Sequence, residues 1–432
     1  MTTHGSTVPS AAAATHGWTA AGWEQVEGAF RRNFADRHEV GAAFAVYHRG
    51  QKVVDLWGGV ADEETGAPWE EDTVVLTFST TKGAAAVVAA LLAQRGQLDM
   101  SAPVADYWPE FAVAGKEKAT VEHLFSHQGG VPWVDVTMSV DDALGWDPVI
   151  RALEAQPAVW EPGTAHGYHA TTYGWLAGEI VRRATGATLG TVFRTEVAEP
   201  LGLDYWIGLP ESEEPRVARL ISILDAIASG RLSGGAAPGT GLGAGTAEDN
   251  AYLEALAERA MEYLGPDGPL SKALSAPSGT LEAGAELIAS RKLHAAELPA
   301  FNGIGDARSL ARMYAAVIGK VETDDGENVR LLDEGTVVDA TRQRTEGPDR
   351  VLLGLDVQFG RGFMVNRGIL AAAGLGSRRA FGHFGMGGSG AWADPEAELA
   401  MAYVMNRMDI GTTGDLRMFS LMRACYDALA AG

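Results

Sequence analysis

The chain has 432 residues, 46% of them hydrophobic and 21% charged, which is typical of a globular protein with a large core. Its 34 basic and 56 acidic residues give a net charge of −22 at pH 7. An acidic excess of this size repels nucleic acid and anionic membranes, so we expect neither as a partner. The single cysteine, Cys425, excludes an internal disulfide framework.

No stretch of the sequence has the features of a targeting or membrane-spanning segment. Residues 1–16 contain neither a basic region nor a continuous apolar run, so we expect no signal peptide. No apolar stretch approaches the length of a membrane span. We therefore expect a cytoplasmic protein; the sequence gives no indication of its oligomeric state.

The first elements predicted are a tail, a helix and a hairpin. Residues 1–17 are small and polar, so we expect a loose tail. Apolar residues at helical spacing over 18–37 predict the first helix. Residues 41–48 and 51–57 predict two strands, because a tight Arg-Gly turn separates them.

The next segment places a serine at the start of a buried helix. Residues 83–92 are almost entirely apolar helix formers, and residues 77–82 lead into them. Ser79 then lies at the helix N-terminus with Lys82 three residues on, over the same face. An alcohol with an amine in reach and backbone N–H groups beside it suits an acyl-transfer nucleophile. The alternative is that Ser79 only caps the helix and that Lys82 is solvated.

A short capped helix is predicted over residues 120–127, with His123 and His127 four residues apart. This spacing permits a zinc site, but no glutamate stands between the histidines in the metalloprotease pattern and no third ligand is evident. We therefore favour two packing histidines and expect neither metal nor cofactor.

A tyrosine is predicted at the entrance to the next long helix. Residues 161–164 form a turn, and an amphipathic helix follows over 171–183 with Gly186 beyond its end. Tyr168 therefore lies on a turn just before a helix, where a phenol can point into a cleft. The alternative is a half-buried tyrosine with an ordinary pKa of about 10.

Residues 211–300 differ in character from the rest of the chain. Ala- and Glu-rich helical pieces surround a Gly-rich stretch at 234–246, which predicts a helical insertion with a mobile loop. Asp306 is the expected N-cap of the helix that follows.

The C-terminal region is predicted to be rich in strands. We expect strands at residues 355–365, 379–393 and 399–405, and a final helix over 413–430. The middle strand contains His383 and Gly385 among several glycines, which let a ligand or another backbone approach closely.

Three motifs in this order resemble the serine β-lactamase and penicillin-binding-protein superfamily. They are Ser79-x-x-Lys82, then Tyr168 on its turn, then His383-x-Gly385 on a late strand. The family places Ser-x-x-Lys, then Tyr-x-Asn or Ser-x-Asn, then Lys-Thr-Gly or His-x-Gly. The resemblance is closest to the esterases of the superfamily, the family VIII carboxylesterases.

Supporting stretches are similar to the same family. Residues 124–132 resemble its Leu-Leu-Ser-His-x-x-Gly-Leu-Pro motif, and residues 161–164 its Pro-Gly-x motif. Residues 167–176 and 393–408 are similar to the esterase branch. The resemblance covers about 40–205 and 302–430, and the 211–300 insertion lies outside it.

Two departures bear on the expected substrate. Ala170 stands where the β-lactamases keep Asn, and His383 stands where they keep Lys. Relative to that family, the chain lacks an amide for the acylamino side chain and a strong positive charge for the carboxylate. The resemblance therefore implies neutral esters rather than antibiotics. No complete Gly-x-Ser-x-Gly is present, which argues against an α/β-hydrolase nucleophile elbow.

The resemblance implies a site and a mechanism. Ser79 attacks the ester carbonyl, while Lys82 and Tyr168 share the proton and lower each other's pKa. The sequence leaves open which of the two is the base. The backbone N–H groups of Ser79 and Met386 are expected to form the oxyanion hole. His383 is expected to order the pocket rather than act as a triad histidine.

The expected fold is α/β (α+β), with a mainly antiparallel sheet flanked by helices and an all-α lobe beside it. Residues 18–80 and 302–432 are assigned to the sheet domain. Residues 81–301, including the 211–300 insertion, are assigned to the helical lobe.

The expected function is hydrolysis of small-molecule carboxylic esters of short to medium chain length through an acyl-enzyme on Ser79. Alternatives are an acyltransferase that uses the same acyl-enzyme, and a weak β-lactamase or D-aminopeptidase. A different class of alternative is a binding module that keeps the fold without catalysis.

Overall fold

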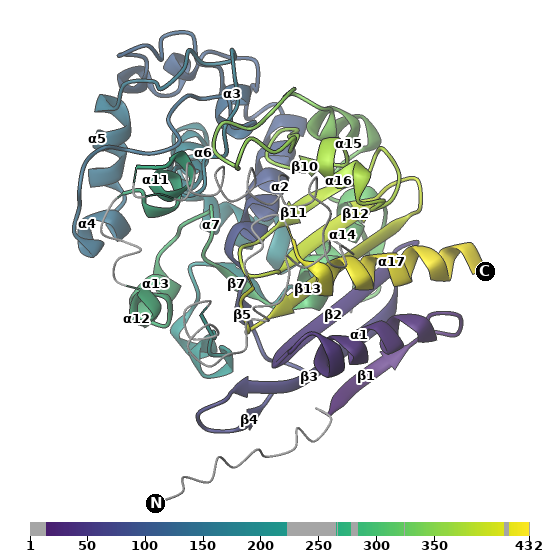
Figure 1. Cartoon of the computed structure of the whole chain (residues 1–432). Coiled ribbons are helices and arrows are strands. Elements are labelled where there is room, and N and C mark those ends of the chain that lie inside the picture. Colours follow the sequence, from purple (N-terminus) through teal and green to yellow (C-terminus); the bar gives the residue numbers. More distant parts are fainter. Residues whose placement is uncertain are drawn as a thin grey trace, which may run out of the picture.

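A sheet of eight strands and a mainly helical lobe lie side by side in the protein (Figure 1). The computed structural model describes residues 14–222, 265, 267–277, 284–323, 325–409 and 414–431. Within these ranges no helix is both long and apolar enough to cross a bilayer.

The main sheet is antiparallel throughout, in the order β1–β3–β2–β13–β12–β11–β10, with β4 beside β3. The expected fold class is thereby confirmed. Its strands are β1 (Thr15–Thr19), β2 (Gly41–His48), β3 (Gln51–Asp62), β4 (Ala67–Pro68), β10 (Met364–Val365), β11 (Phe381–Phe384), β12 (Gly390–Asp394) and β13 (Leu399–Met405).

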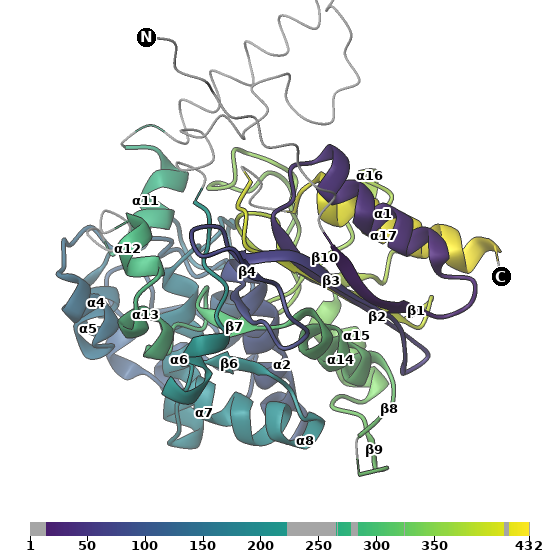
Figure 2. The same ribbon diagram turned by 90° about the horizontal axis from the view of Figure 1, so that it is seen from below.

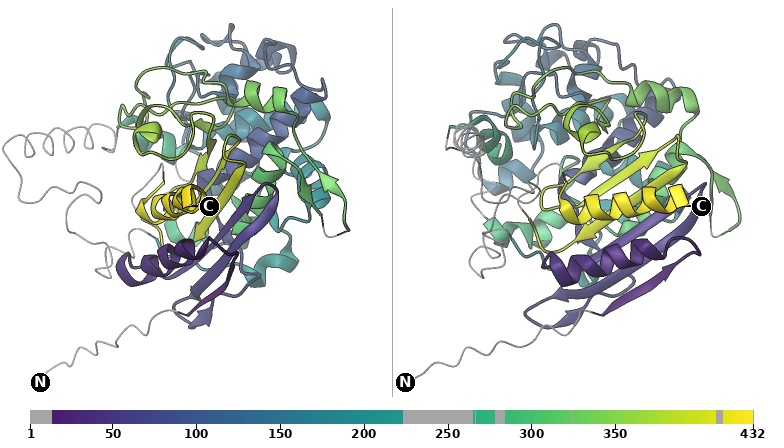
Figure 3. Two further views of the ribbon diagram at one scale, coloured as in Figure 1. Left: turned by 90° about the vertical axis from the view of Figure 1, so that its right-hand side faces the viewer. Right: turned by 45° about the vertical axis from the view of Figure 1, so that its right-hand side comes forward.

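Helices cover both faces of this sheet (Figures 2 and 3). On β2, Phe44 and Val46 pack in the cluster that includes α1 and α17, whereas Ala43 and Ala45 pack with α2 and α14. Alternate residues of a strand face opposite sides, so a strand covered on both sides must be apolar throughout. The covering helices are α1 (Glu24–Asp36), α17 (Leu416–Ala431), α2 (Thr81–Gln94) and α14 (Ala307–Ile318).

The helical lobe joins the rest of the molecule through a small antiparallel sheet. Its strands, in the order β5–β7–β6, are β5 (Val75–Leu76), β7 (Gly303–Gly305) and β6 (Tyr205–Ile207). β6 lies within residues 81–301, so the lobe contains a short strand, whereas an all-α lobe was expected. Its helices are α3 (Val121–Phe125), α4 (Val140–Leu144), α5 (Asp147–Ala155), α6 (Thr172–Thr185), α7 (Leu189–Phe193), α8 (Glu199–Leu201), α11 (Pro269–Ser275), α12 (Gly284–Ile288) and α13 (Arg291–Ala295).

The remaining elements are short. Five are single turns of tighter or wider helix: η1 (Phe78–Thr80), η2 (Val104–Asp106), η3 (Pro109–Phe111), η4 (Arg194–Ala198) and η5 (Glu211–Arg216). The others are α15 (Glu334–Thr341), α16 (Gly368–Ala372) and the hairpin of β8 (Val321–Glu322) and β9 (Asn328–Val329).

The N-terminal prediction is wrong in two respects. Thr15–Thr19 forms β1 and pairs with β3, so residues 15–17 belong to the sheet and not to a tail. The first helix begins at Glu24 rather than at residue 18, because the strand takes the residues before it. Pairing with a distant strand has overridden the local helical pattern.

The C-terminal prediction is wrong about two strands. Residues 379–393 form two antiparallel strands, β11 and β12, because Gly387 and Gly388 have φ values of 89° and 121° that an extended strand does not allow. Within 355–365 only Met364–Val365 pairs as a strand. Helices α11–α13 lie in the 211–300 segment as expected, while the Gly-rich 234–246 stretch lies outside the described residues.

Candidate active site

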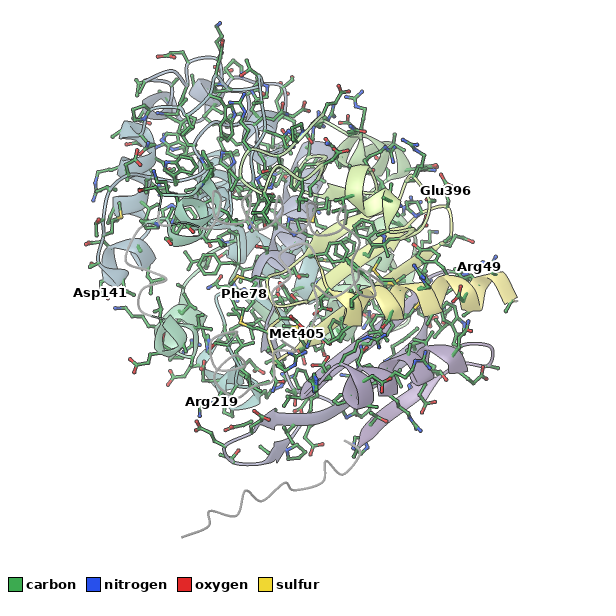
Figure 4. All side chains as sticks on the ribbon, viewed as in Figure 1. Arg49, Phe78, Asp141, Arg219, Glu396 and Met405 are labelled. Carbon is green, nitrogen blue, oxygen red and sulfur yellow. The ribbon has the colours of Figure 1, made fainter. Side chains whose placement is uncertain are left out.

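Ser79 lies where the lobe meets the sheet, in the turn η1 that leads into α2. The preceding residue, Phe78, is labelled there in Figure 4 and has a φ of 47°, which non-glycine residues rarely adopt. Thr77 anchors this turn by donating its backbone N–H (2.9 Å) and its hydroxyl (3.0 Å) to the Gly303 carbonyl on β7. The strained turn presents Ser79 to a cavity that it lines.

Lys82 is fully buried and reaches Ser79 as the motif predicts. Its Nζ lies 3.1 Å from Ser79 Oγ, 2.7 Å from the Ala170 carbonyl oxygen and 2.9 Å from the Ala300 carbonyl oxygen. Burial lowers the pKa of Lys82 well below its ordinary value. A neutral amine fits these partners, because its two N–H groups can serve the two carbonyls and its lone pair can face the Ser79 hydroxyl. The alternative of a solvated lysine is therefore wrong.

Tyr168 lies on the turn before α6 and packs against Lys82. The Lys82 Nζ is 4.8 Å from the centre of the Tyr168 ring. Burial raises the pKa of the Tyr168 phenol well above its ordinary value, and the nearby Ser79 hydroxyl offsets only part of this. The expectation that each group lowers the other's pKa is thus wrong for Tyr168. Its phenol keeps its proton at neutral pH.

His383 lies on β11 beside Tyr168, with the two ring centres 6.1 Å apart. Its Nδ1 is 2.7 Å from the Phe384 carbonyl oxygen, which fixes the proton on Nδ1. Burial and the neighbouring Lys82 lower the pKa of His383 to about 3. The histidine is therefore neutral at physiological pH.

Gly385 allows the β11–β12 hairpin to lie directly against the turn that carries Ser79. A Cβ at this position would lie 2.3 Å from both Ser389 Oγ and the Thr77 carbonyl oxygen. Ser389 joins the two segments, because its hydroxyl donates to the Thr77 carbonyl (2.7 Å) and lies 3.0 Å from Thr80 Oγ1. The third motif and the first are thus one packed unit.

The cavity beside Ser79 is almost entirely apolar. Its empty space, mouth included, is about 730 Å³. Met386 lines it together with Ser79, which is compatible with the expected oxyanion hole. Besides these two, its lining residues are Leu76, Phe78, Ala143, Leu144, Ala170, Thr171, Trp175, Leu274, Leu287, Ile288, Leu293, Leu298 and Phe301.

The two histidines of the zinc alternative serve the local structure. His123 accepts the Thr120 N–H in a capping box at the start of α3, and His127 Nδ1 accepts the His169 N–H at 3.1 Å. Among the described residues no group of three His, Cys, Asp or Glu side chains is placed to hold a metal ion.

Sequence reasoning missed three contributors to the site. Asp349 Oδ1 accepts the backbone N–H of Tyr168 (3.1 Å) and those of two residues in its own loop. The Ala300 carbonyl contacts Lys82, and the Ser389 hydroxyl holds the hairpin. A backbone carbonyl leaves no sequence signal. The turn-forming Gly347-Pro348-Asp349 stretch was the one available hint.

The fold and the serine–lysine site agree with the comparison to known families. The model of the family described as Beta-lactamase matches residues 26–418, so the chain belongs to the beta-lactamase family. The resemblance inferred from the three motifs is thereby confirmed.

Several relatives are similar over most of the chain. The Esterase/beta-lactamase LipL of Mycobacterium tuberculosis is 35% identical over 387 residues, which are 88% of this chain and 80% of that protein. A family VIII carboxylesterase structure has a TM-score of 0.79 at 36% identity, covering 96% of this chain and 100% of that one. A penicillin-binding-protein homolog from Caulobacter crescentus has a TM-score of 0.78 at 36% identity, with the same coverage.

Proposed function

We propose that this protein hydrolyses neutral carboxylic esters of short to medium chain length through an acyl-enzyme on Ser79. The observation that carries the proposal is the contact of a buried lysine with Ser79 at the edge of an apolar cavity. Two relatives named as an esterase and a carboxylesterase support it.

Lys82 is the base for acylation in this proposal. Its lowered pKa favours the neutral amine, which takes the Ser79 proton as Oγ attacks the ester carbonyl. The proton then passes to the departing alkoxide through the Tyr168 hydroxyl, which is protonated and can donate. Water attacks the acyl-enzyme next, giving its proton to Lys82 while Ser79 leaves and is reprotonated.

The oxyanion of each tetrahedral intermediate is assigned to the backbone N–H groups of Ser79 and Met386. Both residues line the cavity, and the hydroxyl bonds of Ser389 hold their two segments together. Loss of one such donor costs about 3–4 kcal/mol in typical serine hydrolases. Neutral His383 supports the Tyr168 side of the pocket without supplying charge.

The cavity favours an uncharged acyl group. Its lining residues include no Lys, Arg, Asp, Glu or His side chain, so a charged group entering it would lose hydration without gaining a partner. Each methylene that enters gains about 0.8 kcal/mol of transfer free energy. The same reasoning disfavours substrates with a free carboxylate near the scissile bond.

A second candidate is slow β-lactam opening, because LipL is named both esterase and β-lactamase. Ser79 is competent for a strained amide, but Ala170 offers no side-chain amide and His383 is uncharged. The double change Ala170→Asn and His383→Lys should raise nitrocefin turnover relative to ester turnover. Nitrocefin turnover by the wild type as fast as its best ester would replace the esterase proposal with a β-lactamase.

The test of the main proposal combines labelling with a substrate series. A fluorophosphonate should label Ser79, and p-nitrophenyl esters from acetate to dodecanoate should give an optimum between two and eight carbons. Lys82→Arg should abolish labelling, while Lys118→Arg, at an exposed lysine paired with Glu161, should leave it intact. Labelling at Ser126 or Ser389 in place of Ser79 would refute the assignment.

A further inference from the structure

The backbone on both sides of Tyr168 is fixed by side chains from two other parts of the chain. On the N-terminal side, Asp349 Oδ1 accepts the Tyr168 N–H at 3.1 Å. On the C-terminal side, His127 Nδ1 accepts the His169 N–H at 3.1 Å. The two bonds fix the peptide planes before and after Tyr168, and therefore the direction in which its side chain leaves the backbone.

His127 holds this turn in further ways. Its carbonyl accepts the Gly167 N–H at 3.1 Å, and its ring centre lies 4.9 Å from that of Tyr168 and 4.4 Å from that of Phe359. The residue keeps a φ of 60° that is unfavourable for a non-glycine residue. Strain of this kind persists where the surroundings over-determine it, which is common at functional sites.

The chemistry of the His127 ring is defined by these contacts. Because Nδ1 accepts a hydrogen bond, its proton must lie on Nε2, which is buried without a partner in the described part of the chain. Burial lowers the pKa of His127 well below its ordinary value, and the nearby titratable His169 and Lys82 act in the same direction, so the ring stays neutral. A neutral ring beside Lys82 adds no charge to the site and lets the amine remain a base.

We propose that His127 is the positioning residue of the catalytic turn, acting through Tyr168 by the hydrogen bond that its Nδ1 accepts from the His169 N–H. This inference rests on the proposed ester hydrolysis and adds a role that neither the serine–lysine pair nor the cavity requires. The peptide that this bond fixes, between Tyr168 and His169, precedes Ala170, whose carbonyl accepts a hydrogen bond from Lys82. His127 therefore acts directly on the backbone of Tyr168 and on Lys82 only through this neighbouring segment.

The test separates the hydrogen bond from the packing of the ring. In His127→Asn, the amide oxygen takes the place of Nδ1 and can still accept, and Asn tolerates positive φ. In His127→Phe, the ring remains but the acceptor is lost. We expect His127→Phe to lose about 10²-fold in kcat with KM within about threefold, because misplacement of a catalytic group by about 1 Å has effects of that size. His127→Asn should retain kcat within about fivefold of the wild type.

A double-mutant cycle tests whether His127 acts through Tyr168. If it does, His127→Phe should lower kcat little further in a Tyr168→Phe background, because residues that act as a unit are non-additive. His123→Ala is the matched control, since that histidine caps α3, which ends just before His127, and does not hold the Tyr168 turn. It should reduce thermal stability and leave kcat unchanged.

Several outcomes would overturn the inference. Equal losses in the Asn and Phe variants, or multiplicative losses in the cycle, would leave His127 a packing residue only. Should His127→Phe fail to fold, His127→Gly removes the acceptor without strain at positive φ, and near-wild-type kcat in that variant would refute the role. Absence of ester turnover in the wild type would instead refute the proposed function.

Discussion

Two groups of residues of opposite character meet at Ser79. The polar wall, made of Lys82, Tyr168 and His383, is buried behind the cavity lining and is held by backbone carbonyls and neighbouring side chains. The apolar wall lines the cavity and includes leucine and isoleucine side chains of α11, α12 and α13. Hydrogen bonds hold the Lys82 and His383 side chains of the first wall, whereas the second wall is held by packing alone.

This difference assigns different roles to the two walls. Directional bonds to Lys82 leave one orientation of its amine, which proton transfer requires. Apolar packing tolerates changes in side-chain size at modest cost, so the apolar wall can vary without loss of the chemistry. Chemistry and substrate size should therefore respond to separate sets of substitutions.

The largest expected effect is at the nucleophile. Ser79→Ala should reduce ester turnover by at least about 10⁴-fold, because loss of a nucleophile removes the covalent route. The fold should persist, since alanine fits the turn before a buried helix. Mass spectrometry after fluorophosphonate treatment gives the readout. An adduct on the folded Ser79→Ala protein would place the nucleophile elsewhere.

The second-largest effect is expected at Lys82, and activity that depends on this residue should change with pH. Since the folded protein lowers the pKa of Lys82, the active neutral form appears as pH rises through that lowered value, and kcat/KM should rise and level off below pH about 10. Lys82→Arg stays charged and should lose about 10³-fold or more at every pH. No inflection from His383 is expected between pH 5 and 9, because its pKa is about 3. A flat profile for the wild type would refute the neutral-lysine mechanism.

Gly385→Ala should have an intermediate effect on both stability and rate. The added methyl meets Ser389 Oγ and the Thr77 carbonyl at 2.3 Å, so the hairpin must move at a cost of about 1–3 kcal/mol. That movement displaces Met386 and should lower kcat by about 10²-fold. Gly335→Ala on α15 meets only ordinary contacts and is the control for chemical denaturation. Unchanged kcat in Gly385→Ala would contradict a role of the hairpin in the oxyanion hole.

The smallest effect should come from the apolar wall. Leu287→Trp fills part of the cavity, so kcat/KM for p-nitrophenyl octanoate should fall about tenfold or more relative to the acetate ester. Acetate turnover should stay within about twofold of the wild type. Ile369→Trp, at an exposed residue of α16, controls for added aromatic surface. An equal loss of kcat/KM for both esters would show that the two walls act as one functional unit.

The polar wall was largely predictable from the sequence because its information is local. Ser79 and Lys82 are three residues apart, where the turn η1 leads into α2, and Tyr168 precedes a helix with clear periodicity. The contacts that the sequence did not predict are those between segments far apart in the chain. The carbonyl of Ala300 that receives Lys82 and the carboxylate of Asp349 that holds Tyr168 come from distant loops without a pattern.

The fold shows the same limit. The apolar runs of β2 and β13 predicted buried strands correctly. The sequence divides β1 between the predicted tail and the predicted first helix, because its pairing with β3 depends on a partner far along the chain. The hairpin of β11 and β12 was taken as one strand, because glycines at a close approach and glycines at a turn look alike in sequence.

The hydroxyl bonds between Ser389 and the Thr77–Thr80 turn connect segments more than 300 residues apart in the chain. During synthesis on a ribosome, the Ser79 segment emerges long before the hairpin that completes its surroundings. In the proposed mechanism, a nascent chain therefore carries the serine and lysine without the assembled oxyanion hole, and acylation waits until the last strands dock. On that mechanism, translation sets the time at which the protein becomes reactive.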